Sequence, residues 1–222
     1  MTQSTGGITF HNLTGTIEVI SGLLIGGPGS GLEAGGIDKT FIRNPADGMP
    51  YVPGSSLKGK VRSLLERQKS KLTGGSPHSC KEVSCEICRL FGAGDVKDQV
   101  PGRGPSRLLF RDARFSDESR RTLNETIVRG DRYFEVKMET RINRDTGTAA
   151  GGTLHTFERI PPGAKFDLLI TLRALAGDNV DALKGEVERG LKAMENDYLG
   201  GSGSRGYGKI AIHLKGWEQA KL

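Results

Sequence analysis

Residues 180–214 read VDALKGEVERGLKAMENDYLGGSGSRGYGKIAIHL, and this stretch says most about the fold. Its first half carries apolar residues every three or four positions, which predicts an amphipathic helix, with Asp178 or Asn179 as the capping residue. Five glycines follow between residues 200 and 208. Residues 209–214 then predict a final strand.

The rest of the chain extends this helix, loop and strand pattern toward the N-terminus. A second helix is predicted from Ser55 or Ser56, one of which is expected to cap it, to about Lys71. The order strand, helix, several strands, helix, strand is typical of an RRM-like or ferredoxin-like βαββαβ core. We therefore expect an α+β fold, with large insertions, in a single domain spanning 1–222. The strands are predicted over residues 14–25, 41–44, 107–115, 133–139, 154–160 and 166–172.

Glycine and charge are the unusual parts of the composition. The chain has 33 glycines among 222 residues, roughly twice the usual share of about 7%. Seven of them lie between residues 22 and 36. Since there is no collagen-type triplet repeat, we expect loops whose backbone approaches a ligand closely. The net charge of +6 favours a polyanionic partner.

The sequence contains no pattern typical of a secretory signal or a membrane span. The N-terminal MTQSTGGITF lacks the basic and apolar regions of a signal peptide, and no apolar run approaches the roughly 18 residues that a span needs. We therefore expect a soluble, cytoplasmic protein with no membrane partner.

A group of metal-ligand residue types lies within eleven residues: His78, Cys80, Cys85 and Cys88. An odd number of cysteines cannot form a complete set of disulfides, and a C-x2-C with two further donors is typical of tetrahedral zinc. The surrounding segment, 73–104, has little periodicity. We therefore expect it to be a Cys-rich insertion stabilised by structural zinc, with His78 the ligand that the spacing supports least. The alternative is three reduced cysteines beside a surface histidine.

The start of the predicted helix near residue 55 has the features of an anion site. Residues 53–60 read PGSSLKGK, and backbone N–H groups at a helix start attract phosphate. The Walker spacing is absent. The alternative is an amphipathic helix with a solvated basic face. The candidate phosphate contacts here are Ser55, Ser56, Lys58, Lys60 and Arg62.

The two glycine loops supply further candidate contacts. In the loop that ends at Gly208, Arg205 and Lys209 can bind phosphate, and Tyr207 can stack on a base. The alternative is a flexible connection. Gly26 and Gly27 of the first loop complete what we expect to be one surface that follows a phosphate backbone.

Several short runs are informative as an ordered set. They are GLLIGG (22–27), GGID (35–38), PYVPGSSLKGKVRSLLE (50–66), CRLFG (88–92), RLLFRDA (107–113), ERIPPGA (158–164) and DYLGGSGSRGYGK (197–209). In this order they resemble the RAMP superfamily of CRISPR proteins, most closely the repeated backbone subunit of type III-A (Csm) effector complexes. The resemblance covers nearly the whole chain.

The resemblance implies both an architecture and a set of partners. It implies an RRM-like palm, a β-hairpin thumb at about residues 124–160, and several copies stacked along a crRNA. Each copy would cut bound target RNA at regular intervals with Mg²⁺ or another divalent cation. The implied partners are crRNA, target RNA, further copies of the chain and other subunits of a type III complex. Near the thumb, Arg141, Arg144 and Arg159 become candidate RNA contacts.

The resemblance also implies a catalytic residue. The family's cleaving carboxylate follows the first glycine motif and corresponds to Asp38 of GGID, as either a metal ligand or a general base. Members often carry a histidine where this chain has Leu24. Two alternatives are a structural RNA-binding subunit in which Asp38 is inert, and a stand-alone repeat-processing nuclease with a catalytic His11, His155 or His213.

Overall fold

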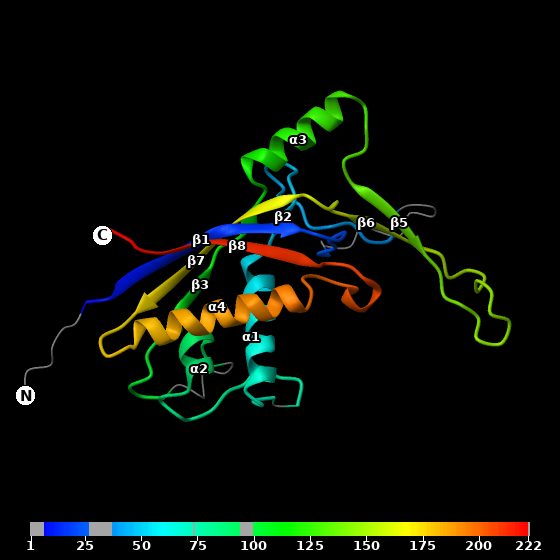
Figure 1. The fold of residues 1–222 in the computed structure, drawn as a ribbon. Helices are drawn as coiled ribbons and strands as arrows, with labels where there is room; N and C mark the ends of the chain where they lie inside the picture. Colours follow the sequence, from blue (N-terminus) through cyan, green and yellow to red (C-terminus); the bar gives the residue numbers. More distant parts are fainter. Residues whose placement is uncertain (1–6, 27–36, 73, 94–99, 222) are drawn as a thin grey trace, which may run out of the picture.

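The computed structural model describes residues 7–26, 37–72, 74–93 and 100–221, with a four-stranded antiparallel sheet at its centre (Figure 1). The strand order is β3-β7-β1-β8. Helix α1 follows β1 in the chain and α4 follows β7, so these elements run in the βαββαβ order. The expected mixed α and β fold is confirmed. The bounds are β1 (Thr9–Val19), α1 (Gly54–Gln68), β3 (Leu108–Phe110), β7 (Lys165–Ala174), α4 (Val180–Asn196) and β8 (Ile210–Gln219).

Strand β1 forms the middle of the sheet and shows why one face is covered. Leu13, Ile17 and Val19 are fully buried and Gly15 is also buried, whereas the alternate residues 14, 16 and 18 are partly exposed. This period of two directs the apolar side chains to one face of the sheet. In Figure 1, α1 and α4 lie on one side of the sheet and α3 (Asp117–Val128) lies on the other.

One of the two core helices begins as the sequence predicts, and the other does not. The prediction that Ser55 or Ser56 caps α1 is wrong, since the N-cap is Pro53 and no side chain caps the helix. Instead, the Gly54 N–H donates to Asp112 Oδ1 at 2.7 Å. Helix α4 is capped by Asn179, whose Oδ1 accepts from the Ala182 N–H at 3.1 Å.

Three predicted strands are shorter or divided in the structure. Strand β1 ends at Val19, well before residue 25. Residues 41–44 form only isolated bridges. The segment 107–115 divides at Asp112 into β3 and a second strand, β4 (Ala113–Arg114), which pairs with β2 (Tyr51–Val52) in a separate sheet.

The Cys-rich insertion contains a helix that the sequence pattern did not predict. Helix α2 (Glu86–Phe91) buries Ile87, Leu90 and Phe91 in the main hydrophobic core. The insertion therefore makes core contacts of its own, which its lack of periodicity did not predict. In Figure 1, α2 lies beside the lower half of α1.

A hairpin projects from one end of the molecule. Strands β5 (Glu135–Glu139) and β6 (His155–Arg159) pair antiparallel, and residues 140–154 extend beyond them as a long loop (Figure 1). The preceding α3 covers residues 117–128, so the start of the expected hairpin region, from 124, is helical. No helix among the described residues is long and apolar enough to cross a membrane.

Candidate functional site

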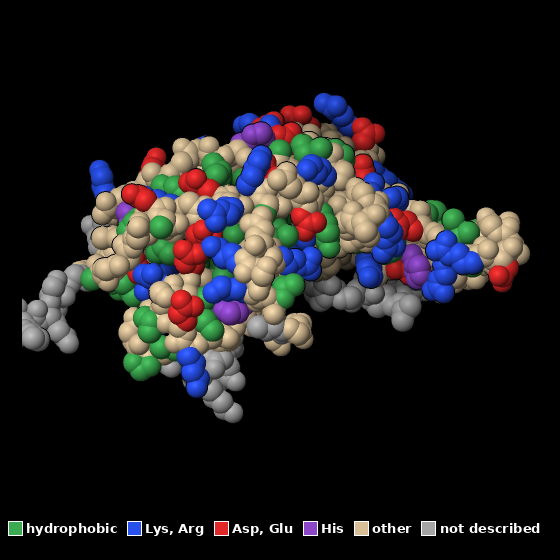
Figure 2. Space-filling view, turned by 60° about the horizontal axis from the view of Figure 1, so that its bottom comes forward, with side chains coloured by type: hydrophobic (Ala, Val, Ile, Leu, Met, Phe, Trp, Pro, Cys, Tyr) green, Lys and Arg blue, Asp and Glu red, His purple; other side chains and the backbone are tan. Residues whose placement is uncertain are grey.

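Asp38 lies in an open cleft of about 670 Å³ at the base of the hairpin. The cleft draws on three separate parts of the chain: the segment after the first glycine loop, the hairpin and the terminal glycine loop. Its lining includes four cationic side chains, which give it a positive character suited to a polyanion. They are Lys39, Lys137, Arg141 and Arg205. Lys and Arg side chains are visible along the side of the projecting hairpin in Figure 2.

Asp38 is held in place by strand β6. Its N–H donates to the Thr156 carbonyl at 3.0 Å, and its Oδ2 accepts from the Thr156 N–H at 2.6 Å. The Asp38 side chain is still 36% exposed, so the carboxylate is fixed in position and open to the cleft. His155 Nδ1 lies 3.9 Å from Asp38 Oδ2. This proximity depends on the fold, because the two residues are far apart in sequence.

The terminal glycine loop contributes one exposed cation and one buried ring. Arg205 is 60% exposed and pairs with Glu139 at 2.8 Å. Tyr207 is 1% exposed, so the expectation that it stacks on a base is wrong. Its hydroxyl donates to Glu139 Oε1 at 2.6 Å, and Lys137 and Arg159 cover its ring. Burial, followed by the Glu139 contact, raises the pKa of Tyr207 to about 12.

The other expected contacts around the hairpin differ in accessibility. Arg159 is largely buried and donates to Glu135 Oε2 at 2.6 Å. Lys209 Nζ donates to the Glu195 carbonyl. Arg141 and Arg144 are exposed on the hairpin loop, and Gly26 is also exposed. Gly27 lies outside the described residues. Arg141, Arg144 and Arg205 are therefore the accessible arginines of this expected set.

The basic face of α1 is mostly used inside the molecule. Lys60 pairs with Asp197 at 2.8 Å and lies over the Tyr198 ring. Arg62 donates to Glu66 Oε1 at 2.7 Å and to the His78 carbonyl at 2.6 Å. Lys60 and Arg62, both candidate RNA contacts, thus each have two partners within the molecule.

The residues nearest the start of α1 are more accessible. Ser55 is exposed, and Ser56 and Lys58 are partly exposed. Burial, and then the nearby Arg62, lowers the pKa of Lys58. These three residues are the remaining candidates for a phosphate contact on this helix.

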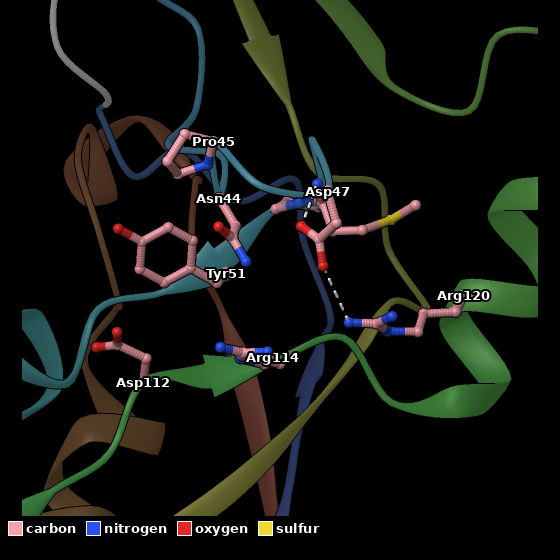
Figure 3. Close-up of a pocket in the computed structure, with 9 residues that line it drawn as sticks. Asn44, Pro45, Asp47, Tyr51, Asp112, Arg114 and Arg120 are labelled. Atoms are coloured by element: carbon pink, nitrogen blue, oxygen red, sulfur yellow. Dashed lines mark hydrogen bonds and ion pairs between the residues drawn. The ribbon is translucent and has the colours of Figure 1, made fainter.

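A small pocket of about 130 Å³ lies beside the start of α1 (Figure 3). The Asn44–Pro45 turn and Tyr51 form one side, and Arg114 lies between Asp112 and Arg120 in this view. Because Asp112 already accepts the Gly54 N–H, its negative charge opposes an anion at this helix start. The anion site expected from the sequence is therefore weaker than its motif suggests.

The four predicted metal ligands come together in the structure. The ligand atoms of His78, Cys80, Cys85 and Cys88 all lie within 4.8 Å of one another. Cys85 Sγ is 3.5 Å from His78 Nε2, and Cys80 Sγ is 3.9 Å from Cys88 Sγ. A tetrahedral zinc ion with bonds of about 2.0 to 2.3 Å needs ligand separations of about 3.5 to 3.8 Å. This cluster can therefore hold a metal ion.

The surroundings of the cluster favour the thiolate at Cys85 and the neutral thiol at Cys88. His78 Nδ1 is buried and has no hydrogen-bond partner among the described residues. Burial raises the pKa of the Cys88 thiol to about 11. Burial also opposes ionisation of Cys85, but hydrogen bonds from the Cys88 backbone, Cys80 and His78 outweigh it and lower its pKa to about 6. Lys71 Nζ lies 3.4 Å from Cys85 Sγ, so the protein supplies a positive charge beside this sulfur.

Comparisons with known proteins agree with the resemblance found in the sequence. Residues 16–211 match the model of the RAMP superfamily. The chain is 40% identical over 203 residues to "CRISPR system Cms endoribonuclease Csm3" of Methanocaldococcus jannaschii, covering 89% of this chain and 76% of the relative. It is 41% identical over 211 residues to the protein of the same name from Methanothermobacter thermautotrophicus, covering 89% and 81%.

Solved structures show the same fold. The chain superposes with a TM-score of 0.57 and 28% identity on a chain of a Csm3-Csm4 subcomplex from the type III-A CRISPR-Cas interference complex, covering 96% of this chain and 88% of that one. It superposes with a TM-score of 0.65 and 24% identity on Csm3 of Methanopyrus kandleri, covering 97% and 78%.

Proposed function

Because the chain belongs to the RAMP superfamily, we propose that it is an endoribonuclease backbone subunit of a type III CRISPR ribonucleoprotein. It binds crRNA along its length, assembles with further copies of itself and cuts complementary target RNA at regular intervals. The name endoribonuclease that its relatives carry supports the activity. The similar structure of a two-protein subcomplex supports contacts with other subunits.

The observation that carries this proposal is the position of Asp38. Its carboxylate is held by Thr156 and opens into a cleft lined by four cations. RNA supplies its own nucleophile, the 2′-OH, so the protein needs to align it with the scissile phosphate, assist proton transfer and offset negative charge. Lys39, Arg141 and Arg205 can contact the phosphates, and Asp38 faces the place where the backbone would lie.

Asp38 also offers one oxygen ligand for a divalent cation. Mg²⁺ is commonly bound by one or two carboxylates together with substrate phosphates and water, so a single carboxylate fits. Glu139 is the other carboxylate in the described lining of the cleft, and Tyr207 and Arg205 already bind its oxygens. When bound, the cation would supply charge stabilisation on the phosphoryl oxygens.

The hairpin and the Cys cluster have structural roles in this proposal. The exposed loop at residues 140–154 acts as the thumb that separates a nucleotide of the target from the guide, with Arg141 and Arg144 near the RNA. The cluster of His78, Cys80, Cys85 and Cys88 holds one structural zinc ion. A site closed by four protein ligands leaves no position for substrate.

The test of the activity uses the assembled complex with guide and target RNA. We expect Asp38→Asn to keep target affinity within about twofold and to reduce the rate of cutting by at least about 100-fold, the lower end of what a proton-transfer group contributes. Asp131→Asn, an exposed aspartate between α3 and β5, is the matched control and should cut normally. Undiminished cutting by Asp38→Asn would reject the catalytic assignment. A wild-type complex that binds target without cutting would instead favour a purely structural subunit.

A further inference from the structure

Glu139 connects the hairpin to the terminal glycine loop. Its side chain is only 15% exposed. One carboxylate oxygen, Oε1, accepts from the Tyr207 hydroxyl at 2.6 Å and lies 3.2 Å from Lys137 Nζ. The other, Oε2, accepts from Arg205 Nη1 at 2.8 Å. The hydrogen bond from Tyr207 is the largest effect on the acidity of Glu139 and lowers its pKa, so the carboxylate is charged and its oxygens are occupied.

The same residue is connected to Asp38 through the hairpin. Glu139 is paired with His155 in the register of β5 and β6. The next residue, Thr156, holds Asp38 by two hydrogen bonds, one to the backbone and one to the carboxylate. A displacement of the end of β5 would therefore shift β6, with which it pairs, and so displace the Asp38 carboxylate.

Backbone hydrogen bonds hold the terminal glycine loop in place beside Tyr207. The Gly208 N–H donates to the Gly22 carbonyl at 3.1 Å, and the Leu199 N–H donates to the Gly208 carbonyl at 2.9 Å. Gly208 has a φ of +69°, and a Cβ there would lie 1.9 Å from the Leu199 carbonyl oxygen, so no other residue fits without moving the backbone. Tyr207 stands next to this fixed point and is buried.

We propose that Glu139 and Tyr207 are positioning residues for RNA cleavage, which set the Asp38 carboxylate and the hairpin relative to the cleft. The inference rests on the proposed function, because it assumes that Asp38 and the hairpin act on target RNA. Tyr207 cannot itself contact the reacting atoms, since it is buried. Its effect must pass through Glu139. A displacement of about 1 Å at a catalytic group can cost about 100-fold in rate.

The experiment measures single-turnover cutting by the assembled complex at saturating target. We expect Tyr207→Phe and Glu139→Ala each to lower the cutting rate by about 10- to 100-fold and to leave target affinity within about threefold. Glu139→Gln should recover part of the rate, because an amide oxygen still accepts from Tyr207. The double variant Tyr207→Phe/Glu139→Ala should be no slower than Glu139→Ala, since both changes remove one shared hydrogen bond.

The controls separate positioning from stability and from failure of the proposed function. Glu118→Gln makes the same Glu→Gln change in a surface pair with Lys165 and should cut at the wild-type rate. If Tyr207→Phe, which removes one oxygen atom, lowers the thermal stability but leaves the rate unchanged, the positioning role is rejected. Additive effects in the double variant would also reject it. If the wild-type complex fails to cut, or if Asp38→Asn still cuts, the proposed function itself fails.

Discussion

Asp178 is a single side chain that joins three segments of the chain. Its carboxylate is 2% exposed and binds Arg107 Nε at 2.7 Å, Arg89 and the Leu175 N–H. Burial raises the pKa of Asp178, but the hydrogen bonds from Arg107, Leu175 and Arg89 outweigh it and lower the pKa to about 2. Since Arg107 is itself 4% exposed, neither charge can be compensated by water.

We therefore expect Asp178→Asn to lower the free energy of unfolding by about 3–5 kcal/mol at pH 7, the usual cost of removing one partner of a buried ion pair. A lowered pKa in the folded state means that this stabilisation is present above the unfolded value near 4 and is lost as the pH falls toward 2. Urea unfolding of the wild-type protein and the variant between pH 7 and pH 3 measures the difference between their free energies of unfolding. This difference should become smaller as the pH falls. Asp131→Asn should change stability little, and equal losses in both variants would contradict the assignment.

The sequence identified the right kinds of residue for the cleft but not which of them face it. Arg62 pairs with Glu66 four residues later, and that spacing is a known helical ion-pair signal, so its internal use was predictable. Arg159 and Tyr207 are different, because Glu135 faces Arg159 only across the β5–β6 pair and Glu139 reaches Tyr207 only where the hairpin meets the glycine loop. Local pattern carries no information about such partners.

The two core helices cross closely at one glycine. A Cβ at Gly190 of α4 would lie 2.6 Å from Val61 Cγ1 and 3.1 Å from Leu65 Cδ1 of α1. Both neighbours are fully buried. Gly185 lies on the same helix, is exposed, and has nothing within 4 Å of the equivalent point. The same substitution at the two positions therefore separates helix propensity from packing.

We expect Gly185→Ala and Gly190→Ala to change the free energy of unfolding in opposite directions. Gly185→Ala should raise the free energy of unfolding by about 0.5–1 kcal/mol, because alanine favours helix. Gly190→Ala gains the same propensity, but overpacking costs about 1–3 kcal/mol, so its stability should fall. Denaturant unfolding of both variants gives the comparison. If Gly190→Ala were as stabilising as Gly185→Ala, α1 and α4 would not pack this closely.

Elements with a clear hydrophobic period were predictable from the sequence, and elements without one were not. Helix α4 and strand β7 follow their hydrophobic periods closely. Helix α3 was missed although Ser116 is a recognisable cap, whose Oγ accepts from the Ser119 N–H, followed by two acidic residues in the first turn. The division of 107–115 into β3 and β4 could not be predicted, because it depends on Asp112 turning to the start of α1.

At the scale of the whole molecule, the Cys-rich insertion is part of the core. Ile87, Leu90 and Phe91 belong to the same buried cluster as the sheet residues. Arg62 and Glu66 of α1 bind the backbone of His78, by its carbonyl and its N–H respectively. A metal ion held at the Cys cluster would therefore stabilise the packing of α1 and not only a surface loop.

We accordingly expect about one zinc ion per chain by elemental analysis, and its loss in Cys85→Ser. Zinc at 100 times its Kd stabilises a fold by about 2.7 kcal/mol, and about 1 kcal/mol moves the Tm of a domain of this size by roughly 2–4 °C. Chelation or Cys85→Ser should thus lower the Tm by about 5–10 °C in one cooperative transition, because the insertion shares the core.

Ser84→Ala, a change at the exposed neighbouring residue, is the control and should leave both the zinc content and the Tm unchanged. Full zinc content in Cys85→Ser would reject this site, and zinc loss with an unchanged Tm would show that the insertion unfolds independently of the core.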